Sequence, residues 1–276
     1  MGSNSIRCGL DKDDIISEIR LSKSADIKKE NVYLVVEGPD DIRFFKKFIS
    51  KNLTLYESFS GKMGVEEIVT LFNDKRVIGV RDKDYQNKPV SAYIFYYDYC
   101  CLEIMLAMNN DVFSSVFEEF YGEKKSFVDV RKHVMEALKP YSAVRMLNEK
   151  RGWEIPLAAI PVTKCTDSTK LISKEKFFQH VRKFPNTNFD ENAVERELNK
   201  VWSDEDLCMR TQGHDFLQLF AYICNRNKLK AGKDVGDECI AKCLRSSFNI
   251  ECLKKTMLYQ SIKKFEDKKK LKIWAA

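Results

Sequence analysis

Three acidic side chains follow two apolar runs of the chain, at the points where those runs end. Glu37 comes directly after Val-Tyr-Leu-Val-Val, and Asp82 and Asp84 come after Val-Ile-Gly-Val-Arg. In an extended segment, Asp82 and Asp84 point the same way, because side chains two positions apart share a face. Carboxylates that gather raise each other's pKa unless a cation balances them. An all-oxygen set without histidine or cysteine suits Mg²⁺ or Mn²⁺, so we expect these three residues to form a catalytic metal site.

Further acids accompany this set. Asp41 follows Glu37 closely, Asp98 ends a later apolar run, and Glu103 stands about one turn into the helix expected after that run. We expect Asp41 and Glu103 to bind a second metal ion or to support the first set by hydrogen bonds. The alternative for any one of these acids is a helix cap or a solvated loop. Asp41 fits that alternative best, because it stands with Asp40 in the first turn of an expected helix.

Strands that alternate with helices would bring these acids together. Apolar runs rich in β-branched residues predict strands, and spacings of three and four predict helices between them. Such alternation is typical of βαβ crossovers and of an α/β fold with a mostly parallel sheet, in which ligands bind at the carboxyl ends of the strands. The expected strands lie within residues 32–36, 53–61, 75–85 and 92–99, and the expected helices within residues 11–22, 39–49, 64–74 and 101–110.

The pattern changes after about residue 110. Helical spacing then dominates, with an exception at residues 153–166, whose two prolines indicate a short strand or a loop. We therefore expect an N-terminal helix and connector at residues 1–30, a catalytic domain at 31–111, and a mainly helical lobe at 112–276.

Composition limits the class of protein. The 276 residues are 32% charged and 44% hydrophobic, which is typical of a globular protein. The nine cysteines contain no C-x-x-C pair and no signal-peptide pattern precedes them, so we expect reduced thiols in the cytoplasm, and no structural zinc. No apolar run approaches the ~20 residues of a membrane helix, so no membrane association is expected.

Basic residues supply the candidate contacts to a polyanion. The net charge of +6 allows such a partner without requiring one. Lys83 and Lys88 stand within and just after the second acidic motif, where they could neutralise phosphate charge. The densest basic stretch lies near the carboxyl terminus, and a second one spans residues 226–233. The candidate nucleic-acid contacts of the first stretch are Lys263, Lys264, Lys268, Lys269 and Lys270.

The two acidic motifs resemble those of the TOPRIM domain. Glu37-Gly38-Pro39-Asp40-Asp41 after one apolar strand, with Asp82-Lys83-Asp84 after another, is similar to the family's Glu and Asp-x-Asp signature, which jointly holds Mg²⁺. The resemblance covers about residues 31–108. It implies a Rossmann-like TOPRIM fold, and the E-G-x-x-D form favours the nuclease branches. Glu37 would then bind metal or act as the general base, and the residues leave these roles open.

The rest of the chain resembles one branch of that family. Tyr96 to Ala107, with Glu103, and the Gly213-His214-Asp215 motif in a helical half are similar to stand-alone OLD-like TOPRIM proteins encoded beside ABC-type ATPases. The effectors of PARIS anti-phage systems belong to this group. The resemblance implies a toxic tRNA endonuclease held inactive by an ATPase partner. An OLD-like DNA endonuclease and a non-catalytic scaffold for nucleic acid or ATPase are the alternatives, and the apolar helical faces leave homo-oligomerisation open.

Overall fold

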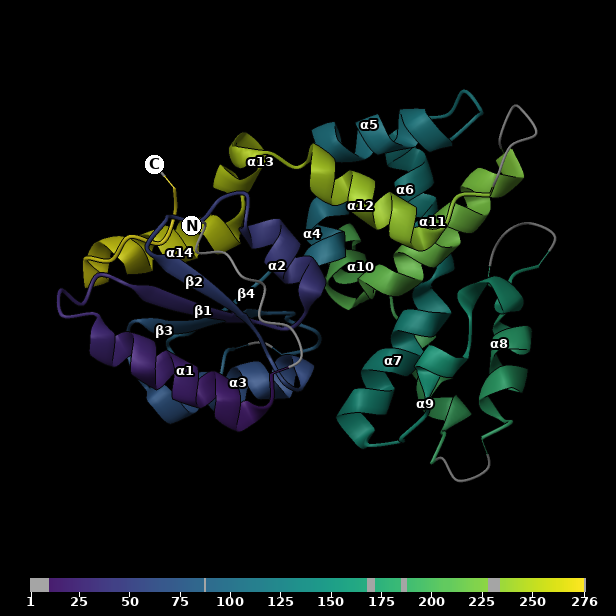
Figure 1. The fold of residues 1–276 in the computed structure, drawn as a ribbon. Coiled ribbons are helices and arrows are strands. Elements are labelled where there is room, and N and C mark those ends of the chain that lie inside the picture. The colour runs from purple at the N-terminus through teal and green to yellow at the C-terminus, as the bar shows by residue number, and fades with distance from the viewer. Residues whose placement is uncertain (1–9, 87, 168–171, 185–187, 228–233, 276) are drawn as a thin grey trace. The chain divides into compact units, whose positions relative to one another are not determined.

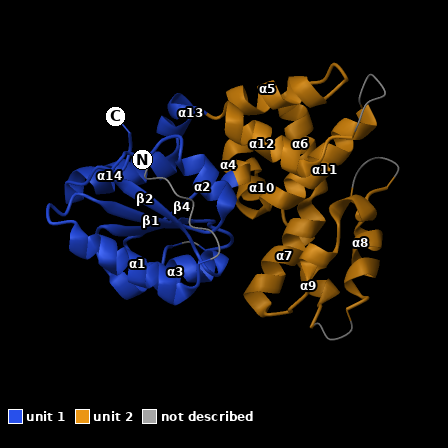
Figure 2. Cartoon of the chain, in the orientation of Figure 1, with its two compact units in different colours: residues 1–102, 249–276 blue, residues 103–248 orange. Residues whose placement is uncertain are grey.

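The computed structural model describes residues 10–86, 88–167, 172–184, 188–227 and 234–275. It divides into two compact units (Figure 2). Residues 1–102 and 249–276 form the first, and residues 103–248 form the second. This division differs from the expected one at both ends, because the N-terminal segment and the C-terminal segment both belong to the unit that carries the sheet.

The first unit is built on a four-stranded parallel sheet with the strand order β2-β1-β3-β4. The expected α/β fold with a parallel sheet flanked by helices and followed by a helical region is thereby confirmed. All five residues of β1 are buried, as a strand covered on both faces requires. The strands are β1 (Val32–Val36), β2 (Leu53–Glu57), β3 (Val77–Arg81) and β4 (Ile94–Tyr96).

Helices cover both faces of this sheet (Figure 1). α1 and α3 lie on one face, and α2 and α14 lie on the other. α1 begins where the Asp11 side chain accepts a hydrogen bond from the Asp14 amide at 2.8 Å, and it buries Ile15, Ile16 and Ile19. The helices of this unit are α1 (Lys12–Ala25), α2 (Pro39–Phe45), α3 (Gly61–Phe72), α13 (Ile250–Lys254) and α14 (Met257–Lys269).

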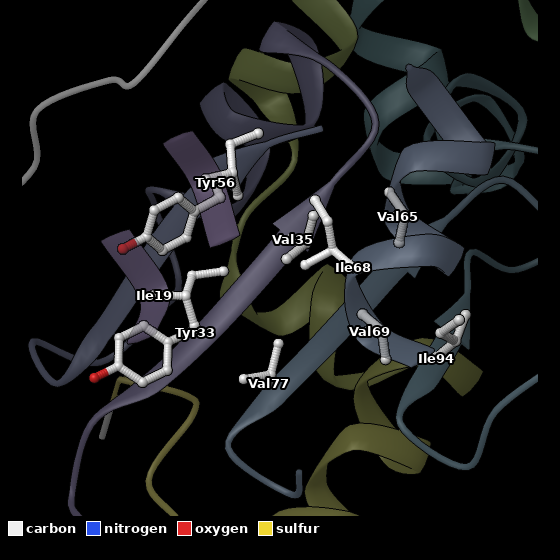
Figure 3. Close-up of a cluster of buried hydrophobic side chains, with 10 residues drawn as sticks. Ile19, Tyr33, Val35, Tyr56, Val65, Ile68, Val69, Val77 and Ile94 are labelled. Carbon is white, nitrogen blue, oxygen red and sulfur yellow. The ribbon is translucent and has the colours of Figure 1, made fainter. Parts of the chain in front are cut away.

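A hydrophobic core fixes α1 and α3 against the sheet (Figure 3). Val35 of β1 packs in this core with Val65, Ile68 and Val69 of α3, all fully buried. Gly79 of β3 lies beneath the same helix, because a Cβ added there would meet Val65 Cγ1 at 2.6 Å. The glycine therefore permits the close approach of α3 to the sheet.

The C-terminal segment returns to the first unit. Trp274 forms an antiparallel bridge with Ile49, and the Ser50 amide donates to the carbonyl of Ile273 at 2.8 Å. Buried Glu266 of α14 accepts from the amides of both Ile273 and Trp274. The prediction that residues 112–276 form one lobe is therefore wrong for its last part, since an amphipathic helix does not reveal by its spacing which core it covers.

The second unit is helical. Its residues 153–166, expected as a strand or a loop, include two short 3₁₀ helices, η1 (Leu157–Ala159) and η2 (Val162–Cys165). No helix in the described ranges is long and apolar enough to cross a membrane. The α-helices here are α4 (Leu102–Met108, which starts at the last residue of the first unit), α5 (Asn110–Phe120), α6 (Phe127–Ala137), α7 (Lys139–Arg151), α8 (Lys174–Val181), α9 (Glu191–Leu198), α10 (Asp204–Arg210), α11 (Gly213–Asn227) and α12 (Asp237–Ser247).

The close contact at Gly79 generates a stability prediction. Gly79→Ala should lower the free energy of unfolding by about 1–3 kcal/mol, because the added methyl group overpacks the contact with α3. Urea denaturation measures this change. Gly236→Ser is the matched control, since a Cβ there meets no described atom within 4 Å and serine is a preferred residue before a helix. A Gly79→Ala protein as stable as its parent would contradict the packing of α3 on β3.

Candidate active site at the carboxyl edge of the sheet

The strand order places Glu37 and Asp82 at a switch point of the sheet. From β1 the chain passes through α2 to β2 on one side, and β3 then pairs with β1 on the other side. The connecting helices α2 and α3 lie on opposite faces of the sheet (Figure 1), and in open parallel sheets ligands bind outside the carboxyl ends of the strands at such a point. Glu37 is the first residue after β1, and Asp82 is the first residue after β3.

Glu37 joins the two strand ends directly. Its Oε1 accepts a hydrogen bond from the amide of Asp82 at 2.6 Å. Burial raises the pKa of the Glu37 carboxyl above its ordinary value, and the nearby Asp84 carboxylate raises it further. The Asp82 amide and the positive charges of Arg81 and Lys62 act in the opposite direction. The expected convergence of Glu37 with the second acidic motif is confirmed, although Glu37 contacts the backbone of Asp82 rather than its carboxylate.

Asp84 carries the second carboxylate close to Glu37. Its backbone has a φ of +48°, a left-handed conformation that asparagine and aspartate tolerate better than most residues. The Asp84 amide donates to the carbonyl of Cys100 at 2.9 Å, which fixes the turn after β3 against the segment after β4. The Asp84 Oδ2 lies 3.0 Å from the ammonium of Lys62, a residue of the first turn of α3 that the sequence analysis missed.

Arg81 holds the turn that carries both aspartates. Its side chain is fully buried, and it donates to the Asp82 carbonyl at 2.6 Å and to the Gln86 side chain at 2.5 Å. It also forms an ion pair with Glu66 of α3 at 2.7 Å and lies over the Tyr96 ring. Arg81 also escaped the sequence analysis, where the only signal was a charged residue at the end of an apolar strand.

The Asp82 and Asp41 carboxylates have partners within the fold. Asp82 Oδ1 accepts from the Leu102 amide at 3.2 Å. Asp41 is buried, and its oxygens accept from the Gly38 amide at 2.9 Å and from the Tyr97 hydroxyl at 2.5 Å. Burial and the negative charge of Asp41 raise the pKa of Tyr97 well above its ordinary value, so the phenol stays protonated as a donor. The helix-cap interpretation of Asp41 is confirmed, and its expected metal or supporting role stays a prediction.

Two other expected acids differ from these in their surroundings. Both carboxylate oxygens of Asp98 accept backbone amides at the start of α14, from Met257 and Leu258, each at 2.8 Å. The prediction that Asp98 joins the other carboxylates at the sheet edge is therefore wrong, because the returning C-terminal helix uses it. Glu103 lies in the first turn of α4 as the first residue of the second unit, so it is not included in the site built from the first unit.

The metal prediction has mixed support from the geometry. Among the described residues, no three histidine, cysteine, aspartate or glutamate side chains lie close enough together to hold a metal ion. The donor chemistry of Glu37, Asp82 and Asp84 is nevertheless all oxygen, which is what Mg²⁺ and Mn²⁺ require. Glu37 and Asp84 lie near enough for the charge of one to raise the pKa of the other. The oxygen ligands of these carboxylates suit Mg²⁺ or Mn²⁺. In the described residues, however, the side chains are not arranged as a complete metal-binding group.

The candidate nucleic-acid lysines differ in their surroundings. Lys263 forms ion pairs with Glu266 and Asp267 of its own helix, so its charge is already neutralised. Lys264 and Lys268 are exposed one helical turn apart on α14. The remaining candidates are Lys83, which is partly buried, Lys88, which is exposed after β3, Lys269, which is partly buried, and Lys270, which is exposed at the end of α14. In the second basic stretch, residues 228–233 lie outside the described residues.

The Gly213-His214-Asp215 motif belongs to the packing of the second unit. Asp215 is buried and accepts two hydrogen bonds from the Arg145 guanidinium of α7, at 2.5 and 2.7 Å. His214 is exposed in the first turn of α11, with Nδ1 3.7 Å from Asp237 Oδ2. The motif thus links α11 to α7. This ion pair gives the buried Asp215 a structural role in the second unit.

Comparison with known proteins does not assign this chain to a family. No protein-family model matches the sequence of this chain, and no curated protein matches it with significance. The resemblance to TOPRIM nucleases thus rests on the acidic motifs and on their place at the ends of β1 and β3.

The buried carboxyl of Glu37 generates a prediction of pH dependence. Its pKa in the folded state is raised above the ordinary 4.5, so the folded chain binds more protons and ionised Glu37 costs stability as the pH rises above that value. Glu37→Gln keeps the acceptor for the Asp82 amide and removes the charge. The variant should therefore be more stable than the parent at pH 7, and the difference should shrink as the pH falls toward 4.5. Urea denaturation at several pH values measures it, and a variant less stable than the parent at pH 7 would contradict the assigned cause.

Proposed function

We propose that this chain is a metal-dependent nuclease that hydrolyses phosphodiester bonds, with Glu37, Asp82 and Asp84 as its active-site carboxylates. One observation carries the proposal. The carboxylate that ends β1 is hydrogen-bonded to the first residue after β3, at the switch point where ligands of open parallel sheets bind. The order and spacing of the motifs support a TOPRIM-type site in particular.

The residues divide the work of such a reaction. Glu37, Asp82 and Asp84 would hold Mg²⁺ or Mn²⁺, which when bound supplies a water of lowered pKa and stabilises the leaving oxygen. The raised pKa of Glu37 also makes its carboxylate a stronger base than an ordinary one, as a general base requires. Asp41, Tyr97 and Arg81 hold the loops after β1 and β3 in place.

The proposal also covers the substrate of the nuclease and the regulation of its activity. We favour host tRNA as the substrate, in a cytoplasmic anti-phage system whose ABC-type ATPase partner restrains the nuclease, with self-association as a further possibility for the free chain. This choice rests on the resemblance to stand-alone TOPRIM effectors. A non-catalytic scaffold is the second candidate, because the Glu37, Asp82 and Asp41 carboxylates each accept a backbone amide and thus have a structural use without a metal.

Cleavage assays test the catalytic proposal. The purified chain should cut total tRNA in Mg²⁺ or Mn²⁺, and removing the metal with EDTA should stop the reaction. Glu37→Ala and Glu37→Gln should lower the rate by about 100- to 10,000-fold, the range typical for loss of an acid–base group. The matched control is Asp40→Asn, which changes a neighbouring carboxylate that forms a surface ion pair with Arg43.

The outcomes separate the candidates. Cleavage of plasmid but not of tRNA would favour the DNA endonuclease. Binding of nucleic acid without cleavage would favour the scaffold. If Glu37→Ala cuts as fast as the parent, this edge of the sheet is not the active site.

Salt dependence tests the basic surface of α14. In a Glu37→Ala background, Lys264→Gln with Lys268→Gln should weaken tRNA binding and reduce the slope of log affinity against log salt by about 1 per lysine that contacts a phosphate. Filter binding between low and physiological salt measures it. Lys254→Gln is the control, because this lysine is paired with Glu251 on α13. An unchanged slope would exclude Lys264 and Lys268 from the interface.

A further inference from the structure

Lys62 is the cation that the chain itself brings to the acidic edge. The turn before it is fixed, since Gly61 has a φ of +47° and its carbonyl accepts the Ser58 hydroxyl at 2.6 Å. A Cβ added to Gly61 would lie only 3.7 Å from Glu37 Oε2, so this turn lies beside the Glu37 carboxylate. The turn after β2 therefore delivers Lys62 to the strand ends of β1 and β3.

The ammonium group interacts with carboxylates from two different strand ends. Lys62 Nζ lies 3.0 Å from Asp84 Oδ2, and its charge also favours the ionised form of Glu37. The Asp84 side chain is only 12% exposed, so water screens this pair less than it screens a surface pair. A positive charge of the chain thus already acts on two of the three carboxylates that would hold a divalent cation.

We propose that Lys62 is the resident counter-ion of this site. In the metal-free chain it pairs with Asp84 and competes with a divalent cation for the carboxylates. With the cation bound, the ammonium turns to a phosphate oxygen of the nucleic acid, which a flexible lysine binds as a point charge. This inference rests on the proposed nuclease function and adds to it a residue that senses both metal and substrate.

A purely structural ion pair gives the opposite expectation for metal binding. If Lys62 only fixed Asp84, its removal would loosen the turn and weaken or leave unchanged the affinity for metal. If Lys62 competes with the metal, its removal should strengthen that affinity. The direction of the change therefore decides between the two roles.

Metal binding by the free protein is the first measurement. Mn²⁺ is titrated into the full chain without nucleic acid, and free Mn²⁺ is followed by electron paramagnetic resonance. Lys62→Met should bind Mn²⁺ about 30-fold more tightly, the factor expected for removing one unit charge about 4 Å from a doubly charged ion in a water-like medium. Lys62→Arg should stay near the parent. Lys12→Met is the matched control, because Lys12 pairs with Glu67 on the exposed side of α3.

Cleavage supplies the second measurement. At saturating Mn²⁺, Lys62→Met should cut about 100- to 1,000-fold more slowly, as expected for loss of a group that stabilises developing charge. The Mn²⁺ concentration for half-maximal rate should fall at the same time. A variant that merely destabilises the site would need more metal, not less.

Each result decides the proposal. Mn²⁺ affinity of Lys62→Met equal to or below that of the parent overturns it, and Lys62→Gln, which keeps a polar side chain, provides the same comparison if the methionine variant does not fold. A parent that binds Mn²⁺ and cuts tRNA while Lys62→Met binds no more tightly overturns this inference alone. A parent that neither binds Mn²⁺ nor cuts nucleic acid overturns the nuclease function, and this inference with it.

Discussion

The pairing of β1 with β3 is the constraint on which the rest of the site depends. The two strands are parallel neighbours, although β2 lies between them in the sequence. Their carboxyl ends therefore lie side by side, at the point where the strand order reverses. The Glu37 carboxylate then lies against the amide of Asp82. A shift of one residue in this register would turn every side chain of one strand to the other face and would separate the two acids.

Charges at this edge are tolerated because each has a partner of the opposite kind. Arg81 lies fully buried between the sheet and α3, where the Glu66 carboxylate and the Asp82 carbonyl receive its guanidinium. The Asp41 carboxylate accepts hydrogen bonds from a phenol and from an amide. Charges that leave water require such partners, and the result is a turn whose aspartates are held by groups from several elements.

The sequence was sufficient to predict the four strands and the proximity of Glu37 to the second acidic motif. The run Val32–Val36 predicts a strand buried on both faces, because its apolar residues do not alternate with polar ones. The observed strand β1 begins and ends at these same residues. Lys62 and Tyr97 were missed, since a lysine in a turn and a tyrosine in an aromatic strand acquire their roles only from distant partners. The spacing of α14 likewise describes an amphipathic helix without saying which surface it covers, and the role of Asp98 follows from that surface.

The return of residues 249–275 to the sheet has a consequence for synthesis of the protein. The ribosome releases β1 to β4 first, then the whole helical unit, and only then α14 and the segment that bridges Ile49 and Trp274. Until that segment emerges, α2 covers its face of the nascent sheet without α14 (Figure 1), and Asp98 lacks the amides that it caps. A chain interrupted before residue 249 thus has the acidic residues after β1 and β3 but not the segment that completes the first unit.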